Sequence, residues 1–357
     1  MQKHIISRIA ITCLLVIVLL IFPDCSSIGT KKIARDRFEY SHELGESWKK
    51  QMLLNIIKVR YLELPIFLDI GQIVSGYSME TSVNMGGTFT GVGPVGSLGA
   101  QGRYTDRPTI TYRPLTGERF LEGFLTPLRP VNVFSLVQSG YEADVVLELC
   151  LDSFNGLHNR SASLASNIQP DPEFFEVLRL MREVQGYGGF GIRNKESEDG
   201  ETSYIIYFRN DLSDKDIRSK GAEIRRLLNI PMDVNELELV YTPTQGAAGE
   251  LGVGTRSLWQ ILAAMSMGIL IPEEHRQKNI VPPLTEVGLE EDALLRVFSG
   301  DNKPDESYVS VEFKDKWFWI EDSDWKSKNT FSSILFLFTL AGSDGGQQLP
   351  TITIPTF

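Results

Sequence analysis

Two glycine patterns in this chain have the spacing of a dinucleotide-binding loop. They are formed by Gly91, Gly93 and Gly96 and by Gly186, Gly188 and Gly191. Such a loop binds pyrophosphate because it leads from a β-strand into the N-terminus of a helix, where free N–H groups face the phosphates. The first pattern lies between two alternating segments and the second follows a helical one. Neither has the required context, so we expect no bound cofactor.

Other side chains that do chemistry are scattered along the chain. The four histidines are His4, His42, His158 and His275, and none stands at metal-ligand spacing from another His or Cys. A zinc site needs three or four converging ligands, so we expect no metal. The sequence also lacks the serine-hydrolase elbow, the H-E-x-x-H motif and the P-loop. The acidic runs at residues 290–292 and 321–324 are more typical of solvated turns than of paired catalytic carboxylates.

Cys25 is the residue whose sequence context most clearly indicates a covalent modification. Lys3 and Arg8 precede an uncharged apolar run over residues 9–22, and Cys25 follows shortly after it. A membrane-spanning helix needs ~20 apolar residues, so this run is typical of a bacterial export signal. The segment resembles a lipoprotein signal, which predicts removal of residues 1–24 and lipidation of Cys25. Cleavage after Ser27 and an uncleaved anchor are the alternatives, because Phe22 and Asp24 depart from the usual lipoprotein pattern.

The residue after Cys25 predicts the destination of the protein. Ser26 stands there instead of Asp, which implies the outer membrane, with the chain facing the periplasm; without the lipid we expect a periplasmic protein. Cys13 lies in the signal, so the folded part keeps only Cys150, which cannot form an intramolecular disulfide. Cys150 belongs to an apolar helical pattern, where a buried, inert thiol is expected.

Charge and composition narrow the class of protein. The 357 residues carry a formal net charge of −11, and 42% of them are hydrophobic. No Lys/Arg cluster is present to displace phosphate counterions, which excludes a nucleic-acid-binding surface. The chain is long enough for a substantial core. The pattern predicts an α+β fold with a boundary between regions 25–128 and 129–357.

Residues 77–112 predict a long amphipathic β-hairpin, because apolar residues alternate with polar ones on both sides of a Gly-rich tip. We expect the apolar face to be an interaction surface. Its predicted members are Tyr77, Met79, Val83, Met85, Phe89, Leu98, Tyr104 and Ile110. If paired residue numbers add to 187, Phe89 lies opposite Leu98, Val83 opposite Tyr104 and Tyr77 opposite Ile110. The same register places Glu80 opposite Arg107 on the polar face, where opposite charges attract.

Helices and short strands are predicted around this hairpin. An apolar stripe formed by Leu44, Trp48, Met52, Ile56 and Val59 predicts an N-terminal amphipathic helix that Pro65 ends. Further helices are expected in the middle of the chain, over residues 117–126, 132–140, 142–156 and 173–189. A helix after Ser213 and a Gly-rich loop before residue 255 are also predicted. The C-terminal region predicts a hairpin that turns at Lys314 and Asp315, and then a helix that begins near Asn329 and Thr330.

Four aromatic residues gather near the C-terminus: Trp317, Phe318, Trp319 and Trp325. We interpret them as core packing between the last hairpin and the last helix. The alternative is a surface for a ligand or partner.

The sequence resembles a family of uncharacterised bacterial envelope lipoproteins. The resemblance is carried by residues 35–78, 107–128, 139–159 (SGYEADVVLELCLDSFNGLHN), 254–272 (GTRSLWQILAAMSMGILIP) and 309–342. It implies a location in the cell envelope and no catalytic residues. We therefore expect a non-enzymatic structural or interaction component, attached to the membrane by lipid, that contacts other copies or other envelope proteins through the hairpin. A periplasm-facing enzyme and a ligand-binding module are the alternatives.

Overall fold

A computed structural model describes residues 28–74, 77–90, 93–106, 109–161, 169–196, 202–209, 211–283 and 293–342. Its contacts divide the chain into two units, Met1–Gln51 and Met52–Phe357. The boundary expected near residue 128 lies inside the second unit. The fold is α+β, as the sequence predicts. Among the described residues, no helix combines the length and the apolar character needed to cross a membrane.

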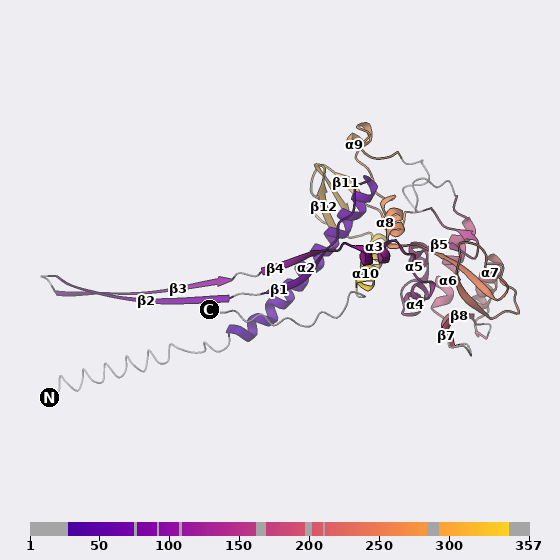
Figure 1. Cartoon of the computed structure of the whole chain (residues 1–357), viewed down its shortest axis with the longest axis horizontal. Helices are drawn as coiled ribbons and strands as arrows, with labels where there is room; N and C mark the ends of the chain where they lie inside the picture. Colours follow the sequence, from indigo (N-terminus) through magenta and orange to yellow (C-terminus); the bar gives the residue numbers. More distant parts are fainter. Residues whose placement is uncertain are drawn as a thin grey trace, which may run out of the picture. The chain divides into compact units, whose positions relative to one another are not determined.

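The elements follow the chain in the order shown in Figure 1. The helices are α2 (Ile28–Arg60), α3 (Glu118–Leu125), α4 (Pro130–Gln138), α5 (Ala143–Cys150), α6 (Pro172–Gln185), α7 (Lys215–Leu227), α8 (Leu258–Ser266), α9 (Glu273–Gln277) and α10 (Trp325–Gly342). The strands are β1 (Leu68–Val74), β2 (Tyr77–Thr90), β3 (Gly93–Asp106), β4 (Thr109–Pro114), β5 (Leu151–Phe154), β6 (Leu157–His158), β7 (Phe190–Glu196), β8 (Thr202–Phe208), β9 (Glu236–Tyr241), β10 (Glu250–Thr255), β11 (Phe298–Gly300), β12 (Val309–Phe313) and β13 (Lys316–Ile320).

The predicted stripe on the N-terminal helix is found on α2. Its last three members, Met52, Ile56 and Val59, are buried, whereas Trp48 is exposed. The helix ends before Pro65, at Arg60. Leu62 adopts φ 57° there, and Glu63 N–H donates to Lys58 O at 2.8 Å. This six-to-one bond is a Schellman C-cap, in which a left-handed residue closes the helix.

A six-stranded mixed sheet has the order β6-β5-β10-β9-β8-β7. Only the β9–β10 pair is parallel. The loop between these two strands crosses the face of β10: a Cβ on Gly252 would collide with Thr244 O, and one on Gly254 would lie 3.1 Å from Pro243 Cα. Glycine at both positions is what allows this close approach. The prediction of an irregular Gly-rich loop before residue 255 is therefore wrong for residues 250–255, because the glycines belong to a buried strand.

The helix predicted over residues 142–156 is also too long, because α5 ends at Cys150 and β5 begins immediately. The buried Arg256 guanidinium donates to Glu148 O at 3.1 Å and to Leu149 O at 3.3 Å, which satisfies carbonyls at the helix end. Asn155 and Gly156 then turn the β5–β6 hairpin with φ 47° and 91°. Asn-Gly between two short strands is a strong hairpin signal that the helical interpretation overlooked.

Two smaller corrections concern the segment around β8. The acidic composition of residues 194–201 predicts a loop, yet Asn194, Lys195 and Glu196 continue strand β7 and pair with β8, so tertiary pairing overrides composition there. The cap of α7 is Asp214 and not Ser213, since the Asp214 carboxylate accepts from the N–H groups of Asp216 and Ile217. Ser213 and Asp214 both have side chains that can accept from the first N–H groups of a helix, and in the structure the Asp214 carboxylate does so.

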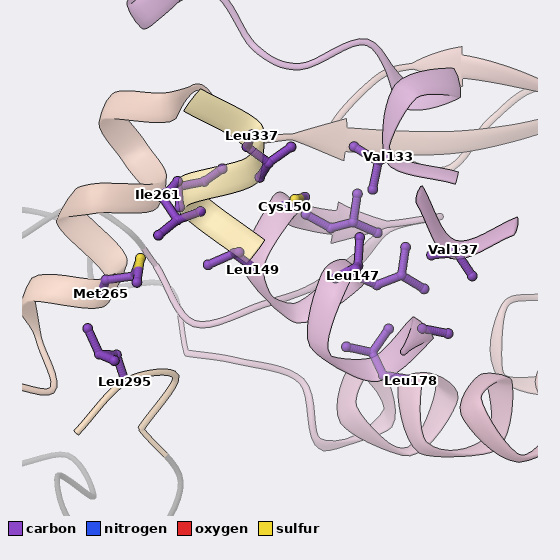
Figure 2. Packing of buried hydrophobic residues seen from close by; sticks show 14 of the residues in the cluster. Val133, Val137, Leu147, Leu149, Cys150, Leu178, Ile261, Met265, Leu295 and Leu337 are labelled. Carbon is purple, nitrogen blue, oxygen red and sulfur yellow. The ribbon is translucent and has the colours of Figure 1, made fainter. Parts of the chain in front are cut away.

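The core is centred on α5. Figure 2 shows its buried side chains with Val133 and Val137 of α4 and Leu178 of α6 on one side, and with Ile261 and Met265 of α8 and Leu337 of α10 on the other. Cys150 is fully buried in this cluster, as predicted, and burial raises the pKa of its thiol to about 12. A thiol held neutral in this way is inert at physiological pH.

The C-terminal hairpin is confirmed, with Lys314 and Asp315 at φ 51° and 63° in the turn between β12 and β13. The following helix begins at Trp325, before the predicted Asn329. Within the aromatic cluster, Phe318 is fully buried and Trp319 stacks on Phe298 with ring centroids 6.0 Å apart. Trp325 is 64% exposed, so the packing interpretation does not hold for it.

Candidate interaction site: a two-stranded ribbon

The site that the sequence predicts is formed by two consecutive antiparallel pairs, β1 with β4 and β2 with β3 (Figure 1). We refer to these four strands as the ribbon. Paired residue numbers add to 183 throughout β2–β3, from Tyr77 and Asp106 to Thr90 and Gly93. They add to 183 also in the part of β1–β4 from Gln72 to Val74. The two pairs therefore share one register.

This register differs from the predicted one, in which paired numbers add to 187. Ile110 lies opposite Ile73 and not Tyr77, and Glu80 lies opposite Arg103. Arg107, the predicted partner of Glu80, lies outside the described residues. The prediction assumed a longer loop, whereas pairing continues to Thr90 and Gly93 and leaves two residues between the strands. Two-residue connections are the commonest in hairpins because the twist of their type I′ and II′ turns matches the right-handed twist of the strands.

The shift of four residues preserves which positions share a face, because side chains alternate with period two. Register pairs on the apolar face of β2–β3 are Tyr77–Asp106, Met79–Tyr104, Thr81–Gly102, Val83–Ala100, Met85–Leu98, Gly87–Gly96 and Phe89–Pro94, with Asp106 and Thr81 as the polar exceptions. Pairs on the polar face are Ser78–Thr105, Glu80–Arg103, Ser82–Gln101 and Asn84–Gly99. The amphipathic character predicted for the hairpin is thus consistent with the observed pairing. Ser82, Gln101 and Arg103 are exposed.

A β-bulge at Gly71 keeps the two faces separate along the ribbon. In β1 the register shifts between Ile70, which pairs with Tyr112, and Gln72, which pairs with Thr111. Within β1 before the bulge, Leu68 and Ile70 occupy even positions, whereas after it Ile73, and then Tyr77 and Met79 of β2, occupy odd ones, with Val74 as the exception. The extra residue therefore brings both sets onto one face. This change of parity is visible in the sequence and could have predicted the bulge.

The β1–β4 pair, which we call the root of the ribbon, exposes side chains on this apolar face. Leu68 is 39%, Ile110 38% and Tyr112 57% exposed. On the opposite face Asp69 pairs with Arg113, which repeats the acidic–basic arrangement of Glu80 and Arg103. Among the described elements, β2 and β3 make extensive contact only with each other. No other described element therefore packs extensively on this pair, and in the described part of the chain both outer edges keep their backbone groups free of ladder partners.

Hydrogen bonds from Asn55 and aromatic contacts of Phe67 anchor the root of the ribbon to the core. The side chain of Asn55, buried on α2, donates to Ile66 O at 2.8 Å and accepts from Ile66 N–H at 3.0 Å. The next residue, Phe67, is buried and packs with ring centroids 4.7 Å from Phe338 and 6.0 Å from Phe124. Leu115 N–H donates to Phe67 O at 2.9 Å and closes the other strand. The sequence analysis missed this anchor, since Asn55 lies eleven residues from Ile66.

Other groupings of reactive side chains serve the fold. His158 Nδ1 lies 3.2 Å from Asp171 Oδ2, and Ser153 pairs with His158 across β5 and β6. A nucleophilic serine must reach both the imidazole and a substrate. The Ser153 hydroxyl is 1% exposed and makes no hydrogen bond, so this trio is not a catalytic triad. Asp171 instead accepts from His158 N–H at 2.7 Å and ties β6 to the start of α6.

Tyr61 and His275 form a buried link between α2 and α9. Tyr61 Oη lies 2.7 Å from His275 Nδ1. Burial lowers the pKa of His275, which keeps the ring neutral, and raises the pKa of Tyr61 to about 12, so the phenol keeps its proton. The phenol therefore donates and Nδ1 accepts. This bond holds the end of the helix that carries Asn55.

A groove of about 950 Å³ lies along α6 and α7. Its exposed cations are already paired: Arg179 with Glu176 and Glu183, Lys220 with Glu183 and Asp216, and Arg226 with Glu223. The charges of these three cations are thus compensated by neighbouring carboxylates. No group of three or more His, Cys, Asp or Glu residues within the described ranges is arranged to hold a metal.

Cys25, the predicted lipidation site, lies outside the described residues. Comparison with protein families, curated proteins and solved structures finds no match to this chain.

Proposed function

We propose that this protein is a non-enzymatic structural component of the bacterial cell envelope, held at the outer membrane by a lipid on Cys25. It assembles with further copies of itself through the ribbon. The observation that carries this proposal is the register shared by β1–β4 beyond the bulge and by β2–β3, which gives one apolar and one polar face, on a pair of strands with which no other described element makes extensive contact.

A ribbon of this kind requires a partner. An isolated two-stranded hairpin is marginally stable in water. An uncovered strand edge presents unpaired N–H and C=O groups that pair readily with another strand. Exposed apolar residues at the root, such as Leu68 and Tyr112, add a surface that associates in water.

A second copy of the chain satisfies these requirements most directly. The free edge of β2 and the free edge of β3 differ, so pairing one with the other between copies is a head-to-tail contact. Repeating that contact around a closed ring leaves no edge unpaired. The acidic–basic pairs Glu80–Arg103 and Asp69–Arg113 lie on one face, and they favour a specific register between neighbours.

The test shortens the ribbon without changing its register or its tip. Deleting residues 83–88 together with residues 95–100 removes six register pairs and retains the Phe89–Pro94 pair and the turn. Six is even, so both faces are preserved in what remains. The mass of the purified protein in mild detergent should be a multiple of the mature subunit mass for the full ribbon and that of one subunit for the shortened one.

Near-ultraviolet circular dichroism serves as the control, because the ribbon contributes nothing to the described core and both proteins should give the same spectrum. A full-length chain that is monomeric in detergent, or a shortened chain of unchanged assembly size, would contradict self-assembly through the ribbon.

The lipid anchor is tested separately. Palmitate labelling of cells should mark the wild-type protein and not Cys25→Ala, and the mass of the mature N-terminus should correspond to an acylated Cys25. An N-terminus at Ile28, or an intact leader, would show that the signal is processed in another way.

A further inference from the structure

The apolar face of the ribbon changes in character along its length. Tyrosines occupy the part nearer the root: Tyr112, Tyr104 and Tyr77, the last opposite Asp106. Methionine and aliphatic positions follow, at Met79, Val83, Met85, Leu98 and Ala100, and Phe89 stands near the tip. Tyrosine has an apolar ring and a polar hydroxyl, which suits the boundary between lipid headgroups and acyl chains.

The length of the aliphatic stretch matches a bilayer. Ten residue steps separate the Met79–Tyr104 pair from the Phe89–Pro94 pair. At ~3.3 Å per residue this is about 33 Å along the strand. Strands in membranes are tilted by about 40°, which reduces the depth to about 25 Å. That depth equals the apolar band of membrane-spanning strands, which is about 25 Å tall.

We infer that the ribbon from the Met79–Tyr104 pair to the Phe89–Pro94 pair lies in the hydrocarbon of a lipid bilayer, with acyl chains against its apolar face. This inference rests on the proposed self-assembly. Backbone N–H and C=O groups find no partners in hydrocarbon, so the free edges of one ribbon must be paired with those of neighbouring copies.

The polar face favours water over lipid. It holds the Glu80–Arg103 pair near the headgroup boundary, where charge facing lipid costs little, and the polar positions Ser82, Asn84 and Gln101 deeper along the ribbon. This face therefore borders the water enclosed by the assembled copies.

The experiment compares neighbouring positions on opposite faces. Val83→Cys and Ser82→Cys, and on the other strand Ala100→Cys and Gln101→Cys, each receive the same environment-sensitive fluorophore. The mature protein extracted from membranes is reconstituted into phosphatidylethanolamine–phosphatidylglycerol vesicles, and unsubstituted protein treated in parallel gives the background. Cys150 is buried and does not compete for label.

We expect a period of two along both strands. Fluorophores at 83 and 100 should shift to the blue and be quenched by lipids brominated in their acyl chains. Those at 82 and 101 should be quenched by aqueous iodide. Adding Val83→Arg to a Phe89→Cys probe should lower the lipid-quenched fraction by at least about thirtyfold, and adding Ser82→Arg should not, because a basic residue facing lipid at mid-depth costs that much.

Two results would overturn the inference. All probes remaining accessible to iodide would place the ribbon in water, and shielding at 83 and 100 without quenching by brominated lipid would place a protein there. If either occurs while the assembly mass in detergent persists, the lipid contact is wrong and self-assembly stands. Loss of that mass in the full chain would instead remove the proposed function itself.

Discussion

The outermost strand pairs of the ribbon and of the six-stranded sheet are antiparallel, yet only in the sheet does another described element cover an outer edge. At β7, the Gln138 side chain of α4 accepts from Ile192 N–H at 2.9 Å, which blocks one of the groups that another strand would use. Neither outer edge of the ribbon is covered by another described element. The sheet also places its apolar side chains against helices, whereas the root of the ribbon exposes Leu68 and Tyr112. The chain thus closes one β structure and leaves the other open for association.

Glycine substitution should give the largest difference between the two regions. Gly252→Val should destabilise the core by about 3 kcal/mol or more, because its side chain would meet backbone atoms of the loop over residues 242–249. Gly99→Val, in the ribbon, should leave core unfolding unchanged. The measurement is urea unfolding followed by tryptophan fluorescence. Equal destabilisation by both variants would show that the ribbon and the core are one cooperative unit.

Replacing an asparagine should likewise destabilise the protein more in the core than in the ribbon. Asn155 donates to Leu228 O at 2.6 Å and accepts from Gly246 N–H and Gly252 N–H at 3.0 and 3.1 Å. Asn155→Ala leaves these buried groups unpaired and should cost about 2 to 3 kcal/mol. Asn84→Ala, on the polar face of the ribbon, is the matched control and should cost nothing measurable. Thermal unfolding by calorimetry compares them, and an equal loss would contradict the distinction.

Acid should weaken the core through His275. Burial lowers the pKa of His275 below its ordinary value of 6.5, so the unfolded chain binds a proton that the folded chain does not. By linkage, the stability that the neutral His275 ring contributes is fully present above pH 6.5, the ordinary pKa that applies to the unfolded chain. It is lost as the pH falls through the lowered pKa of the folded chain. The hydrogen bond from Tyr61 contributes about 1 kcal/mol.

The measurement is urea unfolding of wild type and His275→Gln between pH 7.5 and 5. The wild type should lose more stability than the variant over this range. Glu274, Lys278 and Lys316 lie close to His275 and remain unchanged in both proteins, so their effects cancel. Parallel curves for the two proteins would show that His275 does not titrate differently on folding.

The smallest expected effect concerns the end of α2. Leu62 has φ 57°, a left-handed conformation that residues other than Gly and Asn adopt at a cost. Leu62→Gly should raise core stability by about 0.5 kcal/mol, the relieved strain being partly offset by greater freedom of the unfolded chain. Leu64→Gly, two residues later, is the control and should not stabilise. A lower melting temperature for Leu62→Gly would mean that the exposed leucine makes a contact that outweighs the strain.

The site was predicted well where a local pattern decides the structure. Alternation over residues 77–90 defined the strands and faces, and the Lys314–Asp315 turn was found because both flanking segments alternate. The exact register was not predictable in the same way. A shift of an even number of residues preserves both faces, so hydrophobic pattern does not distinguish a sum of 183 from 187. The two-residue connection decided it.

The prediction failed where distant residues decide. Nothing local ends α5 at Cys150, since Arg256, more than a hundred residues later, satisfies its last carbonyls. Nothing local marks Gly252 and Gly254 as parts of a buried strand, because the loop that requires them is recognised only when β9 and β10 pair. Asn55 likewise acquires its role only when Ile66 folds back beside α2.

The sequence by itself determined the two-faced character of the ribbon, the burial of Cys150 and most helices, since each depends on a periodicity or a composition within a short segment. The tertiary structure decided the register, the ends of α5 and the position of β10, since each depends on hydrogen bonds or steric contacts between residues far apart in the chain. Local patterns choose which side of an element is apolar, and only packing chooses its partner.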